Sequence, residues 1–396
     1  LFISELGLIL HLIKTRIILE LFIFTVGDIF IMTVKPMPAD AIQTLVSYRP
    51  NFGKKISKPL IRLSVNENGI GCSPLVEEAI KKNDIKFYRY PAQQDEDLIE
   101  SIALRFKLKP EKILTGNGSD ELIYLLCTAF LNPGDEAIHT EYGFLVFPQA
   151  IKIAGGVPIV APDDNFTVSV DAIISKLTPK TKLVFLANPN NPTGSMISDQ
   201  ELTRLIDSIP KSVLLILDWA YCEYVTSGLS DAAKLVESNN NVVMLRTFSK
   251  LFGIAALRLG WGYCPPDILA TLQSIRGPFS VNQIAALAGR VAVEDIAFQE
   301  KSVAHNKFWM NEIVNRFNEM GVKTLEGQAN FMLLDFRNKN GPSAAYIANH
   351  LMEQGIQLRD MTPYGLPEML RMSIGRTDEM EKFSLCLRKI LLQEAS

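Results

Sequence analysis

The sequence predicts an α/β fold: a large domain with a mostly parallel central sheet flanked by helices, and a smaller α+β domain. The chain has 396 residues, 47% of them hydrophobic, and single domains usually run to about 50–250 residues. From residue 60 onward, short apolar runs alternate with helical patterns, as in a sheet covered by helices on both faces. After Pro278 a long helical stretch replaces this alternation. Two domains are therefore expected.

The strands expected in the large domain are short and almost wholly apolar, which is typical of a parallel sheet buried on both faces. The first, at residues 113–115, leads through Gly116-Asn117-Gly118 into a helix expected over residues 120–130. Such a strand, glycine turn and helix form the start of a βα unit. The remaining strands are expected at residues 136–139, 181–186, 213–217 and 242–245.

The second domain is expected after a connecting helix. Residues 283–320 carry apolar positions at helical spacing and predict one long or kinked helical region. Strands at 331–334 and 370–374, with a helix at 343–353 between them, predict the smaller α+β domain. The expected division is an extension at 1–31, an N-terminal arm at 32–60 that contributes to the small domain and the site, a large domain at 61–290 and a small domain at 291–396.

The first 31 residues predict a dispensable or non-native extension. Charged side chains interrupt the apolar runs at residues 6–13 and 21–27 before they reach the ~18 uncharged residues of a spanning helix. The first charge is the acidic Glu5, and no small-residue cleavage site follows, unlike in a signal peptide. Met32 opens a more ordinary stretch. The alternative is an apolar helix that lies on a membrane surface.

Charge and composition disfavour several classes of protein. The 40 basic and 43 acidic residues leave a net charge of −3, so no nucleic-acid partner is expected. The five cysteines and four histidines are scattered, without a Cys-x-x-Cys or His-Glu-x-x-His pattern, so we expect no metal and a reducing, cytoplasmic location. A nicotinamide dehydrogenase would need Gly-x-Gly-x-x-Gly after its first strand, and a DNA-binding regulator would need a basic recognition helix; the sequence has neither.

Three polar segments each follow an expected strand, at the edge where open α/β sheets bind ligands. They are Asn188-Pro189-Asn190-Asn191-Pro192-Thr193-Gly194, Asp218-Trp219-Ala220-Tyr221 and Thr247-Phe248-Ser249-Lys250. Taken singly, they are read as a tight turn, a helix cap and an exposed lysine. Together they bring an amine, a carboxylate and hydrogen-bonding groups to one edge, which are the groups that pyridoxal 5′-phosphate needs.

Each part of this cofactor has a candidate partner. Its aldehyde needs a lysine for a Schiff base, which would be Lys250, and its pyridine nitrogen needs a carboxylate to stay protonated, which would be Asp218. Its phosphate would lie on the glycine turn, where backbone N–H groups and the helix dipole favour an anion. The other candidates are Tyr221 and Asn191 for the ring O3′ oxygen, Tyr142 for stacking on the ring, and Gly118, Ser119, Asp120, Ser249 and Arg258 for the phosphate.

From about Pro36 to the C-terminus, the sequence resembles the fold-type-I class I/II aminotransferases and, within them, the histidinol-phosphate aminotransferases. The segments that carry the resemblance are, besides the three above, Leu63-Ser64-Val65-Asn66-Glu67-Asn68, Arg89-Tyr90-Pro91, Gly116-Asn117-Gly118-Ser119-Asp120-Glu121, Arg258, and Leu370-Arg371-Met372-Ser373-Ile374-Gly375. The resemblance implies the cofactor roles given above for Lys250, Asp218, Tyr221, Asn191, Ser249 and Arg258.

The resemblance also implies residues that the patterns alone do not indicate. Tyr90 would reach the cofactor phosphate of the other subunit, so a homodimer is expected. Arg371 would bind an amino acid's α-carboxylate, a task suited to a planar bidentate donor. Tyr48 and Arg359 would bind the phosphate of the substrate itself.

The activity that the resemblance implies is amino transfer in histidine biosynthesis. In a ping-pong reaction the amino group would pass between L-glutamate/2-oxoglutarate and L-histidinol phosphate/imidazole-acetol phosphate, with Lys250 moving the proton. Two alternatives share the fold: an aromatic amino-acid aminotransferase and a phosphothreonine-type decarboxylase.

Overall fold

The computed structural model describes residues 25–26, 29–30, 36–43, 45, 60–92, 95–226, 228, 232–325, 327–337 and 341–394. The chain forms two compact units, Leu1–Ser47 and Tyr48–Ser396. The first contains the antiparallel strands β1 (Thr25–Val26) and β2 (Ile29–Phe30) and the helix α2 (Asp40–Gln43). Most of the expected extension at 1–31, and the candidate Tyr48, lie outside the described residues. Among the described residues, no helix has the length and apolar character needed to span a lipid bilayer.

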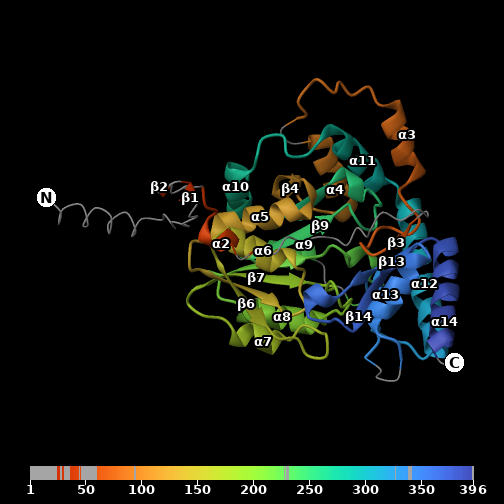
Figure 1. The fold of residues 1–396 in the computed structure, drawn as a ribbon. Helices are drawn as coiled ribbons and strands as arrows, with labels where there is room; N and C mark the ends of the chain where they lie inside the picture. Colours follow the sequence, from red (N-terminus) through yellow and green to blue (C-terminus); the bar gives the residue numbers. More distant parts are fainter. Residues whose placement is uncertain are drawn as a thin grey trace. The chain divides into compact units, whose positions relative to one another are not determined.

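The second unit contains the expected, mostly parallel sheet (Figure 1). Its seven strands have the order β4-β10-β9-β8-β7-β5-β6, and β10 alone runs antiparallel to its neighbours. The strands are β4 (Ile113–Gly116), β5 (Glu136–Thr140), β6 (Val157–Ala161), β7 (Thr181–Ala187), β8 (Leu214–Asp218), β9 (Val242–Thr247) and β10 (Gly260–Tyr263). The five strands expected from apolar runs are confirmed.

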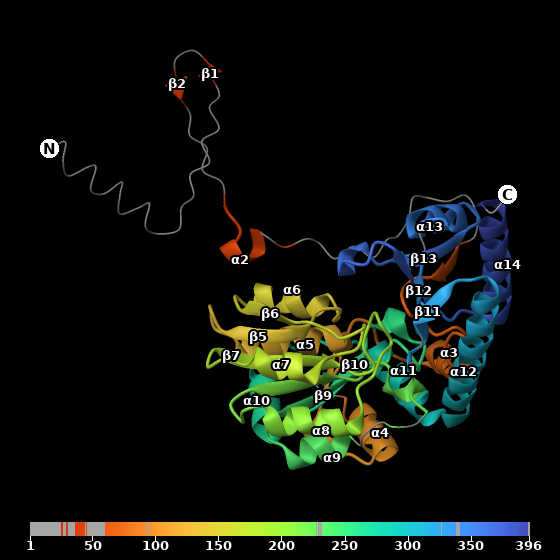
Figure 2. The same ribbon diagram turned by 90° about the horizontal axis from the view of Figure 1, so that it is seen from below.

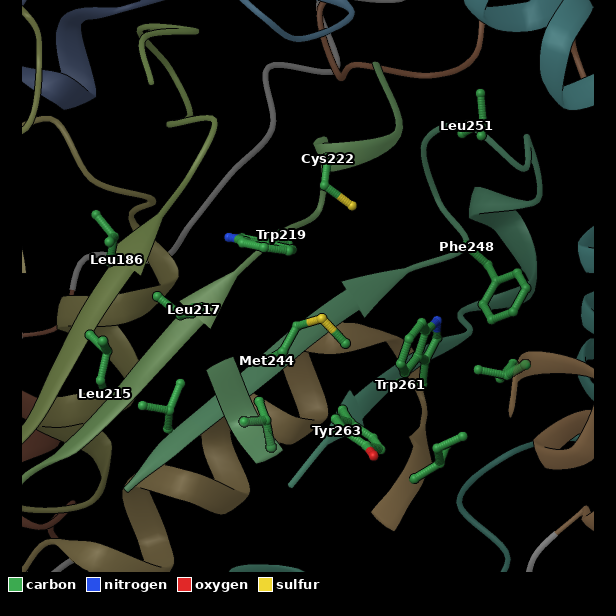
Figure 3. Close-up of a cluster of buried hydrophobic side chains, with 14 of the residues drawn as sticks. Leu186, Leu215, Leu217, Trp219, Cys222, Met244, Phe248, Leu251, Trp261 and Tyr263 are labelled. Atoms are coloured by element: carbon green, nitrogen blue, oxygen red, sulfur yellow. The ribbon is translucent and has the colours of Figure 1, made fainter. Parts of the chain in front are cut away.

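Helices cover both faces of this sheet. Alternate side chains of the central strands enter two different cores, as the period of two in a strand requires: Leu215 and Leu217 of β8 enter one core, and Leu214 and Ile216 the other. Figure 3 shows part of the first core, where Met244 lies between Leu217 and Trp261. Its helices are α4 (Glu96–Phe106), α7 (Val170–Ser175), α8 (Asp199–Ser208), α9 (Ala232–Ser238) and α11 (Gln283–Glu294); the second core has α5 (Gly118–Phe130), α6 (Val146–Ile153) and α10 (Pro266–Ile275).

A smaller five-stranded sheet has the order β11-β12-β14-β13-β3. Its strands are β3 (Ile61–Leu63), β11 (Lys323–Leu325), β12 (Phe331–Asp335), β13 (Ile356–Asp360) and β14 (Met369–Ser373). The expected large domain began at residue 61, whereas β3 pairs in parallel with β13 of the small sheet. Leu63 of β3 is buried in the core of the small domain, so β3 belongs to that domain.

The connection between the domains is two helices rather than one. The helix α11 ends at Glu294, and α12 (Ile296–Glu319) begins after Asp295, whose Oδ1 accepts a hydrogen bond from the N–H of Phe298 at 3.1 Å. This N-cap explains the kink that the sequence pattern allowed. Figure 2 shows α12 and α14 (Thr377–Glu394) side by side along the small domain, which also contains α13 (Ala344–Glu353); α3 (Pro74–Lys82) packs on α11.

Candidate active site

A cavity of about 260 Å³ lies where β7, β8 and β9 end. This is the carboxyl edge of the parallel strands, where open α/β sheets bind ligands. Residues 65–67, which follow β3, and Arg371 of β14 close the cavity from the small domain. The candidates that line it are Ser119, Asp120, Asn191, Asp218, Tyr221, Ser249, Lys250, Arg258 and Arg371. The structure therefore brings these separate motifs into one site.

Lys250 follows β9 and extends its amine into this cavity. Its Nζ donates to the backbone oxygen of Val65 at 3.3 Å and lies 5.5 Å from the centre of the Tyr221 ring. Burial, together with the positive charges of Arg371 and Arg258, lowers the pKa of this amine to about 8. At this pKa part of the amine is neutral near pH 7, so it can act as a nucleophile and a proton carrier.

Asp218, the last residue of β8, is a buried carboxylate. Only 5% of its surface is exposed, and its Oδ1 accepts a hydrogen bond from the N–H of Ala220 at 3.1 Å. Burial raises the pKa of this carboxyl group to about 7, and the nearby charge of Asp120 adds to the effect. A buried carboxylate is stabilised by a cationic partner, so Asp218 suits a ligand with a protonated nitrogen.

The N-terminus of α5 forms an anion-binding corner. Gly118, at the start of the helix, has a φ of +78°, and a Cβ added there would lie 2.7 Å from Nη2 of Arg258. The guanidinium of Arg258 donates to Asp120 Oδ2 at 3.2 Å and to Ser249 Oγ at 3.4 Å. Backbone N–H groups at a helix start and an arginine beside them fit a phosphate group.

Two arginines lie next to each other on the small-domain side. Arg371 of β14 is directly opposite Arg359 of β13, and directly paired residues project from the same face of a sheet. Both are buried, with 4% and 3% of their surfaces exposed. Arg371 donates to Asn191 Oδ1 and, at 3.1 Å, to the backbone oxygen of Ser64, while its buried Nε has no hydrogen-bond partner among the described residues. Two adjacent buried cations favour an anionic ligand.

Tyr142 is not among the side chains that line the cavity, and the stacking of its ring on the cofactor remains a prediction. Its N–H donates to Asp163 and its carbonyl accepts from Asn190, and these bonds fix the backbone so that the ring lies 5.4 Å from that of Phe166. Phe144, two residues further on, lines the cavity instead.

Arg359 and Tyr90 also lie outside the cavity lining. Arg359 lies beside Arg371, directly across the strand pair described above. Tyr90 is 81% exposed and stacks on Phe279, with 4.7 Å between the ring centres. Tyr48 belongs to the residues that the structure does not describe.

Sequence reasoning did not assign a role to Asn66, although it lines the cavity and donates to the Tyr221 hydroxyl at 2.8 Å. Its backbone φ of +58° is uncommon outside glycine but is adopted by asparagine more readily than by most residues. Within the part of the chain that the structure describes, no group of three or more His, Cys, Asp or Glu side chains could hold a metal ion.

Comparison with known proteins identifies the family. The model of the aminotransferase class I and II family matches residues 58–384. The chain belongs to this family. A histidinol-phosphate aminotransferase of Rhodospirillum centenum is 41% identical over 352 residues, which are 88% of this chain and 96% of that protein. One of Rhodospirillum rubrum is 42% identical over 349 residues, 87% of this chain and 94% of that protein.

Solved structures of the family have the same fold. Histidinol-phosphate aminotransferase from Sinorhizobium meliloti, in complex with pyridoxal-5′-phosphate, has a TM-score of 0.83 and 25% identity, and the match covers 91% of this chain and 99% of that one. Aspartate aminotransferase from Thermus thermophilus with maleate has a TM-score of 0.75 at 21% identity, over 84% of this chain and 92% of that one, and supports the fold alone. The expected fold-type-I aminotransferase architecture is confirmed.

Proposed function

We propose that this family member is a pyridoxal-5′-phosphate-dependent histidinol-phosphate aminotransferase. It transfers an amino group between L-glutamate/2-oxoglutarate and L-histidinol phosphate/imidazole-acetol phosphate. The observation that carries the proposal is the cavity in which Lys250, Asp218 and Arg371 meet. The 41% identity to a curated enzyme of this activity, over 96% of that enzyme's length, supports the choice of substrate.

The residues of the cavity fit the cofactor. Bound pyridoxal phosphate supplies an aldehyde that joins an amine, and a protonated ring that withdraws electrons from the carbon whose proton is moved. Lys250 would hold the aldehyde and Asp218 the ring nitrogen's proton. Tyr142 remains the candidate for stacking on the ring, and Phe144, two residues further on, lines the cavity. The phosphate ligands would be the backbone of Gly118 and the residues Ser119, Asp120, Ser249 and Arg258, and the O3′ contacts Asn191 and Tyr221.

Lys250 performs the proton transfer. Because its pKa is lowered to about 8, the amine can both take up and release a proton near neutral pH. Asp218 is held in place by the Ala220 N–H, and there it would keep a proton on the ring nitrogen. Lys250 thus moves a proton, whereas Asp218 keeps one in place.

The substrate's anionic group binds on the small-domain side. The guanidinium of Arg371 presents a planar pair of donors to the α-carboxylate of glutamate. Arg359, directly across the strand pair, adds a second buried cation for the phosphate of histidinol phosphate, which has no α-carboxylate. Tyr48 is proposed as a further phosphate contact.

We also propose a homodimer in the cytoplasm. The Tyr90 side chain is 81% exposed and held by stacking on Phe279, so it is available to a second copy of the chain, whose cofactor phosphate it would reach. Five free cysteines, three of them buried, are consistent with a reducing compartment.

The test is the absorbance spectrum of the purified protein loaded with pyridoxal phosphate. Glutamate should remove the absorbance of the lysine-bound cofactor, and imidazole-acetol phosphate should restore it. No change with glutamate would reject an aminotransferase. Restoration by phenylpyruvate but not by imidazole-acetol phosphate would instead identify an aromatic amino-acid aminotransferase, and release of carbon dioxide from phosphothreonine would identify a decarboxylase.

A further inference from the structure

Asn66 occupies a position at which the two domains and the cavity meet. It follows β3, is 1% exposed and lines the cavity that contains Lys250 and Tyr221. Its φ of +58° lies in the left-handed region, which costs free energy for residues other than glycine. The backbone oxygen of Asn66 accepts a hydrogen bond from Asn330 Nδ2 at 3.2 Å, which helps to hold this conformation.

Three further hydrogen bonds connect Asn66 to Ser373 and Tyr221. Its backbone N–H donates to Ser373 Oγ at 2.8 Å, and Ser373 Oγ donates to Asn66 Oδ1 at 3.1 Å. The Nδ2 of Asn66 donates to the Tyr221 hydroxyl oxygen at 2.8 Å. The side chain therefore lies between Ser373 of the small sheet and Tyr221 of the large domain.

These bonds determine which way each proton points. A backbone N–H can only donate, so Ser373 Oγ accepts from it and has its single proton left for Asn66 Oδ1. In the structure the Oδ1 atom faces Ser373, and the NH₂ group faces Tyr221. Since an NH₂ group only donates, the Tyr221 oxygen accepts, and the hydroxyl proton of Tyr221 must point to something other than Asn66.

We propose that Asn66 is a positioning residue that directs the hydroxyl proton of Tyr221 toward the cofactor's O3′ oxygen. The inference rests on the proposed function, in which Tyr221 is an O3′ contact. Ser373 acts through Asn66, because its hydroxyl fixes the orientation of the amide. Ser373 is two residues after Arg371 on β14, so the strand that carries the substrate arginine also sets the tyrosine proton.

The test is N66D, which keeps the size of the side chain and replaces its donor by a second acceptor. A carboxylate at this position would accept the Tyr221 proton and turn it away from the cofactor. The O3′ oxygen would then lose a donor, so its negative charge would retain the proton on the neighbouring Lys250 nitrogen to higher pH. We expect the midpoint of the pH titration of the bound cofactor's absorbance to rise by about one pH unit or more.

A second variant and a control separate this effect from others. N66G accepts the positive φ without strain and adds no charge, so it should raise the midpoint by a smaller amount and weaken pyridoxal phosphate binding several-fold, as measured by tryptophan fluorescence. N306D introduces the same change at a buried asparagine that donates to the Ala329 oxygen outside the cavity, and should leave the midpoint unchanged.

The outcomes are distinct. If the wild-type protein binds no pyridoxal phosphate at Lys250, the proposed function fails. If it does bind, but both N66G and N66D titrate within roughly 0.3 pH unit of the wild type, the positioning role is overturned while the proposed function stands. If N66D does not fold, N66G alone decides. A rise in N306D equal to that in N66D would attribute the shift to buried charge and also overturn the role.

Discussion

At the scale of single residues, the acid–base character of the site comes mainly from burial. Burial shifts the pKa of Lys250 downward and that of Asp218 upward, so both groups change charge within about one unit of neutral pH. The buried Tyr221 is affected in the same way: burial raises its pKa, while the charge of Arg371 and the hydrogen bond from Asn66 lower it. The site is therefore prepared for proton transfer before any ligand enters.

The pH dependence of cofactor capture follows from the lowered pKa of Lys250. Only the neutral amine attacks an aldehyde, and Nζ loses its proton as the pH rises through about 8. The rate of pyridoxal phosphate capture by the cofactor-free protein should therefore increase about tenfold per pH unit below pH 8 and level off above it. Stopped-flow absorbance measures this rate. A capture rate that continues to rise up to pH 10 would show an ordinary exposed lysine. The control is K250A, in which borohydride reduction and peptide mapping should find no captured cofactor.

Asp218→Asn should reduce kcat by at least about a hundredfold, because an amide cannot hold the proton of the cofactor's ring nitrogen. Steady-state kinetics with glutamate measure the loss. Asp163→Asn is a matched control, since Asp163 is another largely buried carboxyl group with a pKa raised by burial, to about 6, but lies outside the cavity lining. Equal losses in both variants would show that Asp218 supports the fold and not the chemistry.

At the scale of elements, the paired strands β13 and β14 divide the recognition of substrates. Arg359→Ala should lower kcat/KM for histidinol phosphate by roughly ten- to a hundredfold, as expected for a charge-assisted contact of about 1.5–3 kcal/mol. Any activity toward phenylalanine, which has no phosphate, should change little. Arg371→Ala should damage the glutamate and phenylalanine reactions alike. If Arg359→Ala lowers the rates for histidinol phosphate and phenylalanine equally, the phosphate role is wrong.

The elements also show what a sequence pattern can predict. Strands such as β8 were predictable because burial on both faces requires a continuous apolar run, and the polar residues that follow them marked the site. The strand β10 was missed because its sequence, Gly-Trp-Gly-Tyr, contains glycines, and a Cβ at Gly260 would lie 2.2 Å from the Ser119 nitrogen. The need for a glycine at position 260 thus depends on Ser119, which is more than a hundred positions away in the chain.

Long-range contacts also decide which side chains line the site. Tyr142 was predicted to stack on the cofactor; hydrogen bonds with Asp163 and Asn190 hold its backbone, and Phe144, two residues further on, is the aromatic residue that lines the cavity. Likewise, Asn66 was recognisable as part of a motif, but its role depends on Tyr221 and Ser373, which lie far along the chain. The sequence was enough to predict which polar residues lie at the ends of the strands. It was not enough to predict which of their side chains contact each other.

At the scale of the whole molecule, the proposed homodimer predicts complementation between two defective chains. Y90A should weaken pyridoxal phosphate binding, and K250A should abolish its covalent attachment. In a mixed dimer, the site with Lys250 from the Y90A chain and Tyr90 from the K250A chain is complete, so one of its two sites should regain wild-type affinity.

Fluorescence titration after the two variants are unfolded and refolded together measures this recovery. Tyr88→Ala is the matched control, because Tyr88 lies in the same segment and is 78% exposed. It should bind the cofactor as the wild type does. If mixing Y90A with K250A restores no site, Tyr90 acts within its own chain or not at the cofactor.

The parallel pairing of β3 with β13 has a consequence for how the protein is made. The ribosome releases residues 61–63 first, and their partner at residues 356–358 emerges almost 300 residues later. At ~5–20 residues per second, the interval is roughly 15–60 s. During that time the core that buries Leu63 is incomplete. Asn66 gains its partner Tyr221 part-way through the interval and its partner Ser373 only after it. The nascent chain can thus form much of the large sheet while its catalytic centre is still incomplete, so a polypeptide cut short before β13 would be folded in part and inactive.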